Sequence, residues 1–286
     1  MISATRNRVN IKEAPVVVNV LSPRLFSAIQ SISVAESLNY QPGVRVETNC
    51  QNCGFTQVRL NGLDGSYTQV LINSRAVFSA LNSVYGLEQI PTSILDRIEV
   101  VRSGGSALYG SNAIAGTVNI ITKDPVLNSW QISSNLGFID GKIPDRTINI
   151  DASVVNEELT SGITVFGMKR DRNSYDANHD GFSELTELSN TNLGAKAFLK
   201  PNDNSKITLD LTALEEYRRG GDQLNIAPHL TDITEELHHN TIIGGITYEF
   251  HNQDRSNNFS IYSSGQHTDR KSFYGGLGGG RTRQDS

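Results

Sequence analysis

From about residue 128 onward, apolar and polar residues alternate along the chain with a period of two. Between residues 130 and 138 the apolar positions are Trp130, Ile132, Leu136 and Phe138, and polar or small residues stand between them. The pattern is equally regular in 147–154 and 207–213, and less regular in 193–199 and 242–250. Side chains of a β-strand point alternately to its two faces, so each segment predicts a strand with one apolar and one polar face.

Two kinds of antiparallel structure use such strands. A soluble sheet turns its apolar face to a core, whereas a transmembrane barrel turns it to lipid. The predicted strands of nine to eleven residues have the length that a tilted membrane strand needs. Short connections alternate with long ones, which favours the barrel because its two rims differ in this way. The short connections are 156–162, 201–205 and 251–257, and the long ones are 170–190 and 217–240.

The overall composition narrows the function classes. A net charge of −5 over 286 residues gives no indication of a nucleic-acid partner. No run of 18 apolar residues is present, so no transmembrane helix is expected. The first thirty residues contain no signal peptide, which indicates either a cytoplasmic protein or an N-terminus that has been cut off. The argument below favours the second explanation.

The first part of the chain, residues 10–125, mixes short strands with short helices. A helix is expected within Pro23–Leu38, where Ser33 and Glu36 have the spacing of a capping box. The predicted strands are Ala14–Leu21, Val58–Leu60, Thr68–Ile72, Ile94–Val101 and Thr117–Thr122. This pattern predicts an α+β globule ahead of the alternating strands.

The segment 95–122, LDRIEVVRSGGSALYGSNAIAGTVNIIT, is similar to the plug signature of TonB-dependent outer-membrane receptors. Gln57–Gly62, Gln69–Ile72 and Leu87–Pro91 fit the same domain. The resemblance covers residues 3–125 closely and the later strands loosely. It extends to a Bacteroidetes-type branch with haem receptors, and to cobalamin and siderophore receptors. Asn73-Ser74 stands where the family often has Asp-Gly, so the turn there is expected to be built differently.

The resemblance implies an α+β plug domain followed by the antiparallel strands of an incomplete transmembrane β-barrel. Residues 1–9 would be a remnant of the TonB-box region, because Ile2–Arg6 resembles the residues at and after that box. Residues 10–125 would be the plug, and residues 126–286 would supply about seven strands where the family has about twenty-two. The chain is therefore expected to be a receptor fragment.

The implied function is TonB-dependent transport of haem, cobalamin or a ferric siderophore across the bacterial outer membrane. The expected partners are a TonB-type energy-transducing inner-membrane protein, the metal chelate and outer-membrane lipid, with no nucleic acid. Segments 49–55 and 73–85 are expected at the plug apices, where five residues would contact ligand: Asn52, Phe55, Ser74, Arg75 and Tyr85. Arg97 and Arg102 are expected either to pair with barrel carboxylates or to form a surface charge cluster on a strand edge.

The only two cysteines, Cys50 and Cys53, lie in a turn-like segment without a helical period. They are too few for a four-thiolate zinc site, and a redox C-x-x-C motif should open a helix. A small loop disulfide is the favoured interpretation, with free thiols and redox chemistry as alternatives. A disulfide would require an oxidising compartment.

Residues 176–187 fit the calcium-loop pattern D-x-[DN]-x-[DN]-G-x5-E at every specified position. Calcium binds six to eight oxygens, and the flanks do not predict the two helices of an EF-hand. We therefore expect a structural calcium loop between two strands on the extracellular side, with a solvated acidic loop as the alternative. The expected ligands are Asp176, Asn178, Asp180, the Phe182 carbonyl, Glu184 and Glu187.

Two further possibilities complete the sequence-based interpretation. His238 and His239, at the end of the second long loop, could ligate haem iron, but a pair of polar residues entering a strand is the favoured interpretation.

No nucleophile–base–orienter set, P-loop or zinc-helix motif occurs, so the protein is not expected to be an enzyme. The alternative to a receptor is a soluble calcium-binding β-sandwich module for adhesion or carbohydrate recognition.

Overall fold

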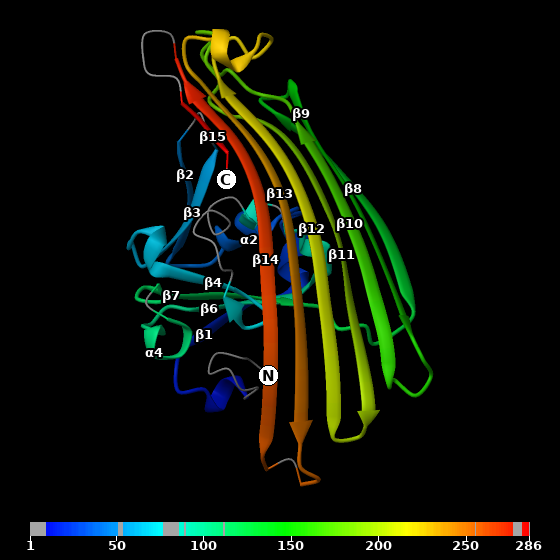
Figure 1. Ribbon diagram of the computed structural model, residues 1–286. Helices are drawn as coiled ribbons and strands as arrows, with labels where there is room; N and C mark the ends of the chain where they lie inside the picture. The colour runs from blue at the N-terminus through cyan, green and yellow to red at the C-terminus, as the bar shows by residue number, and fades with distance from the viewer. Residues whose placement is uncertain are drawn as a thin grey trace. The chain divides into compact units, whose positions relative to one another are not determined.

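The computed structural model describes residues 10–50, 54–76, 86–88, 90–110, 112–254, 256–276 and 282–285. They form two compact units, each with its own sheets (Figure 1). The first unit contains residues 10–49 and 55–123, and the second contains residues 124–286 together with residues 50–54. Within the described residues, no helix combines the length and the apolar character needed to cross a membrane.

The first unit mixes short helices and strands, as the sequence predicts. Five strands form one sheet in the order β1-β6-β7-β4-β5, in which β4 and β7 run parallel and the other neighbours antiparallel. A separate two-stranded sheet consists of β2 and β3. The strands are β1 (Val18–Leu21), β2 (Val44–Cys50), β3 (Phe55–Leu60), β4 (Thr68–Ile72), β5 (Arg75–Ala76), β6 (Leu95–Val101) and β7 (Gly116–Thr122). The α-helices are α1 (Pro23–Ala28), α2 (Val34–Leu38) and α4 (Ser106–Tyr109), and the 3-10 turns are Ile11–Glu13, Gly65–Tyr67, Gly86–Glu88 and Thr92–Ile94.

The helix expected within Pro23–Leu38 is in fact two short helices, because the backbone takes a positive φ of 53° at Gln30 between them. Ser33 caps α2 as predicted, and its hydroxyl accepts a hydrogen bond from the Glu36 N–H at 3.4 Å. The Glu36 carboxylate reaches back to the Ile32 N–H at 2.9 Å, one residue before the cap. The capping pair therefore satisfies two backbone donors at the start of α2.

The core of the first unit lies on the two central strands. Ile98 and Val100 of β6 and Val118 and Ile120 of β7 are fully buried. Burial of each such side chain stabilises the fold by about 1.5–3 kcal/mol, so these adjacent strands are the main source of stability in this sheet. Glu99 lies among them, equally buried, and its carboxylate accepts a hydrogen bond from the Arg97 Nε–H at 2.7 Å. A buried carboxylate needs such a partner.

The turn at Asn73-Ser74 joins β4 to β5. Both residues have positive φ, 50° and 66°, as in the hairpin turns that favour Asn and Gly. The Asn73 side-chain oxygen accepts a hydrogen bond from the Thr122 N–H at 3.0 Å, and the Ser74 N–H donates to Asn119 Oδ1 at 2.9 Å. Neither residue is glycine, and hydrogen bonds that involve the side chains of Asn73 and Asn119 hold the turn against β7.

The second unit contains one antiparallel sheet of eight described strands in consecutive order, β8 to β15. This is the predicted arrangement of an α+β region followed by antiparallel strands in an unclosed sheet, with one strand more than expected. The strands are β8 (Ser129–Ile139), β9 (Ile143–Val155), β10 (Ser161–Arg172), β11 (Glu187–Asn202), β12 (Ser205–Gly221), β13 (Thr234–His251), β14 (Asn258–Gly275) and β15 (Thr282–Asp285).

The sheet has two faces of opposite character, as the alternation predicts. On one, here called the apolar face, large apolar side chains are 38% to 77% exposed. These are Trp130, Ile132, Leu136, Phe138, Ile148, Ile150, Val154, Ile163, Val165, Leu193, Leu199, Leu209, Leu211, Ile242, Ile246, Tyr248, Phe250, Phe259 and Ile261. The other, here called the polar face, carries buried polar residues such as Thr147, Asn149, Asn190, Asn192, Glu216, Arg218, His239 and Thr241.

Strands β9 to β14 are longer than the predicted nine to eleven residues, and β12 and β13 have 17 and 18. Their hydrogen-bonded pairing continues past the apolar residues into polar ones, such as Tyr217 opposite His238. The two long connections consequently shrink to residues 173–186 and 222–233. Hydropathy marks where the apolar face ends, whereas backbone pairing decides where a strand ends.

Asp124, the first residue of the second unit, is held by two lysines from neighbouring strands. Its carboxylate lies 2.6 Å from Lys196 Nζ of β11 and 3.0 Å from Lys206 Nζ of β12. Burial alone would raise the pKa of Asp124, but the two ammonium groups lower it to about 2. The start of the second unit is therefore fixed to the middle of its sheet by a three-charge cluster.

We expect Asn73→Ala to lower the free energy of unfolding by about 2 kcal/mol, because alanine tolerates positive φ less well than asparagine and the change removes the bonds to Thr122. Asn73→Gly should cost about half as much, since glycine tolerates the turn. Chemical denaturation of the two variants measures both values. Equal losses would contradict the role assigned to the backbone conformation.

We expect Asp124→Asn to lower stability at pH 7 by roughly 1–2 kcal/mol, after allowance for partial exposure. Because the folded pKa is depressed, this contribution is present above pH ~4 and disappears as the pH falls toward 2. Thermal unfolding at several pH values should therefore show the variant and the parent protein converging in acid. Asp203→Asn, at an exposed acid in the β11–β12 turn, is the matched control.

Candidate ion-binding loop and outer rim

Connections of the second sheet alternate between its two rims, because consecutive strands run in opposite directions. Residues 140–142, 173–186 and 222–233 lie on one rim, here called the long-loop rim. Residues 156–160, 203–204 and 252–257 lie on the other. The predicted segregation of short and long connections is therefore present, with the tight turn 140–142 as an addition to the long-loop rim.

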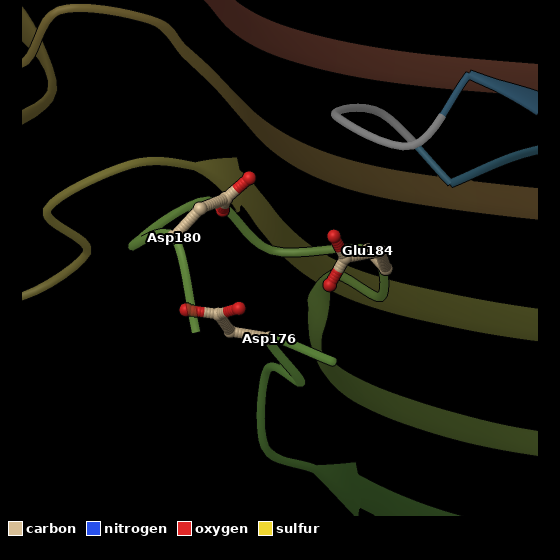
Figure 2. A group of neighbouring side chains, drawn as sticks. All are labelled: Asp176, Asp180 and Glu184. Carbon is tan, nitrogen blue, oxygen red and sulfur yellow. The ribbon is translucent and has the colours of Figure 1, made fainter. Parts of the chain in front are cut away.

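The β10–β11 connection brings together three of the acidic residues predicted to bind calcium. Oxygen atoms of Asp176, Asp180 and Glu184 all lie within 4.8 Å of one another (Figure 2). Asp180 is exposed, and the other two are partly buried. Three carboxylates at this separation repel one another, and a hard cation between them would remove the repulsion.

Backbone donors hold the three carboxylates in place. Asp176 accepts hydrogen bonds from the His179 N–H at 2.7 Å and the Gly181 N–H at 2.9 Å. Asp180 accepts one from the Phe182 N–H at 2.9 Å, and Glu184 one from the Ala177 N–H at 2.5 Å. The chain reverses at Gly181, where φ is +87°. The loop is a tight turn in which three of the motif's acidic side chains converge.

The remaining predicted ligands occupy different positions. Asn178 lies beside Asp180, with its side-chain amide donating to the Asp180 carboxylate at 2.9 Å. Phe182 forms an isolated bridge with Asp222, at the start of the next long connection. Glu187 lies outside the group of three, because it begins β11 and pairs with Arg219 of β12. The atoms that converge as possible metal ligands are carboxylate oxygens, which calcium prefers.

Neighbouring connections brace this loop, which the sequence did not indicate. The Ser183 N–H donates to the Gly221 carbonyl at 3.0 Å, and the Gly221 N–H donates back to the Ser183 hydroxyl at 3.0 Å. Tyr175 interacts with Asp140 of the β8–β9 turn, and burial followed by this carboxylate raises the pKa of Tyr175. Strand pairing brings these residues together, and no local spacing in the sequence encodes it.

The two histidines lie within β13 rather than in a loop. His238 is on the apolar face with its side chain about half exposed, 3.5 Å from the Glu236 carboxylate, whereas His239 is buried on the polar face. This matches the interpretation of two polar residues in a strand. Because consecutive strand residues point to opposite faces, the pair does not converge on one site.

The predicted ligand-contact and lock residues are only partly described. Ser74 and Arg75 lie at the β4–β5 turn, Phe55 begins β3, and Asn52 and Tyr85 fall outside the described residues. Arg97 contacts Asp96 and Glu99 of its own strand, and the Arg102 carbonyl accepts a bond from the Asn61 side chain. Cys50 ends β2 and Cys53 is outside the described residues, so the disulfide stays a prediction.

Comparison with known proteins gives matches for both units. Residues 10–117 match the family model of the TonB-dependent receptor plug domain. Over 122 residues the chain is 35% identical to the vitamin B12 transporter BtuB of Photobacterium profundum, and 29% identical to that of Vibrio vulnificus. Each match covers 43% of this chain and 20% of the relative, so the chain matches about a fifth of the length of these curated relatives.

Solved structures show the same fold at low sequence identity. The alcaligin outer membrane receptor FauA of Bordetella pertussis has a TM-score of 0.71 at 13% identity, covering 97% of this chain and 43% of that one. The ferric enterobactin receptor PfeA of Pseudomonas aeruginosa has a TM-score of 0.68 at 17% identity, covering 92% and 42%. These likenesses extend through the second sheet, and so confirm the predicted fold class.

Proposed function

We propose that this chain, whose residues 10–117 form the plug domain of a TonB-dependent receptor, serves the active uptake of a metal chelate across a bacterial outer membrane. The family is one of receptors and transporters rather than enzymes, in agreement with the sequence. The chain spans less than half of the solved receptors that it resembles, so transport is proposed for the complete receptor to which these residues correspond.

The observation that carries this proposal is the apolar face of the second sheet. Its large side chains, from Trp130 in β8 to Ile261 in β14, are exposed in an unbroken series across seven strands. Isolated exposed apolar residues are common in soluble proteins, but a continuous apolar surface of this extent is not. Lipid is the solvent in which such a face is stable.

The soluble β-sandwich is the rival interpretation. A sandwich needs a second sheet to cover the apolar face, with both inner faces packed about 10 Å apart. The described part of the chain contains two other sheets. One is the five-stranded sheet of the first unit, and the other consists only of the two short strands β2 and β3. Lipid would cover the apolar face in the membrane interpretation, which needs further strands only to close the barrel, whereas the sandwich needs a second sheet over this face.

Cobalamin or a ferric siderophore is the substrate class that we propose. The BtuB relatives transport vitamin B12 by name, and the structural neighbours are receptors for alcaligin and enterobactin. A TonB-type inner-membrane protein would supply energy from the proton-motive force and rearrange the plug. Haem stays a further candidate without support from His238 or His239, which point to opposite faces of β13.

Deletion of the encoding gene should abolish high-affinity uptake of either cobalamin or a ferric siderophore, and an uncoupler should have the same effect on the parent strain. Uptake of the labelled chelates measures both.

In the same strains the receptor should fractionate with the outer membrane, and the purified receptor should need detergent to stay monodisperse. A protein that is monodisperse without detergent would contradict the membrane assignment and favour the soluble module.

The acidic loop is proposed to bind one calcium ion as a structural element. Asp176, Asp180 and Glu184 supply converging carboxylates, and Asn178 lies beside them with its amide oxygen accepting a hydrogen bond from the Asp180 N–H at 3.1 Å. Bound calcium would remove the repulsion among the carboxylates and so stiffen a loop that is bonded to Gly221 and Asp222. The proposed role is to order the long-loop rim, where ligand would first arrive.

Isothermal titration should show calcium binding to the parent protein and at least a tenfold weaker affinity for Asp176→Asn, which keeps the turn but removes one charge. Asp254→Asn is a matched control, because Asp254 also accepts a backbone bond, from Ser256 at 3.0 Å, in a turn on the opposite rim. Absence of heat at millimolar calcium, or equal affinities in the three proteins, would disprove the site.

A further inference from the structure

Gly54 is the last residue of the segment 50–54, which connects β2 to β3 and belongs to the second unit. Its carbonyl accepts a hydrogen bond from Arg218 Nη1 of β12 at 3.0 Å, and both residues are buried. The two residues are 164 positions apart in the chain, so no local pattern brings them together. The second sheet therefore holds this connection at one defined backbone atom.

The position of Gly54 requires glycine for two reasons. Its backbone has a φ of +61°, a conformation that residues with a Cβ rarely adopt. A Cβ at this position would also lie 2.8 Å from Arg218 Nη1 and 3.0 Å from Thr186 Oγ1, which is closer than ordinary van der Waals contact. The Gly54 carbonyl reaches Arg218 because the backbone can pass this close to β12.

Glu216 fixes the direction in which the Arg218 guanidinium points. Arg218 Nε–H donates to Glu216 Oε1 at 2.8 Å, and Arg218 Nη2–H donates to Glu216 Oε2 at 3.3 Å. Two bonds to one carboxylate hold the planar guanidinium in a single orientation, in which Nη1 meets Gly54. A lysine carries a single ammonium nitrogen and lacks this forked geometry.

The Glu216–Arg218 pair adds little to the cohesion of the sheet. The two residues are 1% and 2% exposed, and burial of two charges often costs more free energy than their mutual attraction supplies. Both lie on β12, so their pairing joins no two strands. The cross-strand neighbours of Arg218 are Leu188 and Leu237, each 1% exposed, so an apolar residue would suit the position. The specific effect of the pair is to aim one donor at Gly54.

We propose that Arg218 is a positioning residue, which together with Glu216 fixes the segment 50–54 before ligand arrives. The proposal rests on the proposed function, because residues 49–55 form one of the two segments that the sequence predicts to contact the chelate. A segment that is already ordered loses less conformational entropy on binding, and this raises affinity. Arg218 therefore acts on the capture of ligand and not on the later step that the inner-membrane partner would drive.

Hydrogen exchange in the purified receptor, without ligand, tests the contact directly. Arg218→Lys should raise the exchange rate about tenfold in peptides that span Gly54, because the aimed bond to its carbonyl is lost. Arg219→Lys is the matched control, since this neighbouring buried arginine points to the other face of β12 and donates to the Ile226 carbonyl instead. Peptides that span Gly54 should exchange at the parent rate in the control.

A second variant separates positioning from a general structural role. Glu216→Gln combined with Arg218→Met removes the aimed donor without leaving a buried charge, so it should unfold at the temperature of the parent receptor. Cyanocobalamin and ferric enterobactin are the two probes, and the parent receptor is expected to bind one of them. The dissociation constant of that probe should rise about tenfold in the double variant, while the maximal uptake rate at saturating probe stays unchanged.

The outcomes distinguish this inference from the proposed function. Parent-like exchange at Gly54 in both Arg218 variants, or an equal rise in Arg219→Lys, would show that Arg218 does not hold the segment. Faster exchange with unaltered affinity, or a fall in maximal uptake alone, would overturn the role in ligand capture. A parent receptor that binds neither probe would contradict the proposed function and with it that role, whereas the exchange rates would still decide whether Arg218 holds Gly54.

Discussion

Backbone hydrogen bonds between antiparallel neighbours are the interaction on which the second unit depends. They fix which residues stand side by side, and with the two-residue period they fix which face each side chain takes. A shift of one residue in any of these pairings would move the exposed apolar residues to the polar face. The long ladders, such as that from Ser205–Phe250 to Gly221–Thr234, make such a shift costly.

The same ladders build the loop that is proposed to bind calcium. The acidic loop has its shape partly because β10 and β11 hold its two ends, and it is braced because β12 ends next to Ser183. It requires neither a helix nor a buried apolar core, and it depends on strands that extend past the apolar face.

Buried charges are paired in two ways. Some pairs lie within one strand: Glu99 with Arg97 in β6, and Glu216 with Arg218 in β12 at 2.8 Å. Pairs of the second kind join different segments: Arg170 binds Asp145 through two hydrogen bonds of 3.0 and 2.7 Å, and Asp124 joins β11 to β12. Pairs of the second kind tie the sheet together, because breaking one leaves a poorly solvated charge without its partner.

The sequence by itself determined the two-part organisation, the α+β character of residues 10–125, the faces of the later strands and the spacing of the acidic loop. These depend on local periods and short motifs, which a single sequence displays. It did not determine the strand ends, the positive φ that divides the helix predicted within Pro23–Leu38, or the opposite orientation of His238 and His239. Only the tertiary structure decided that Glu187 pairs with Arg219 instead of converging with the other acidic residues of the loop, and that Ser183 meets Gly221. Both contacts join residues that are distant in sequence, and strand register, which no local pattern specifies, brings them together.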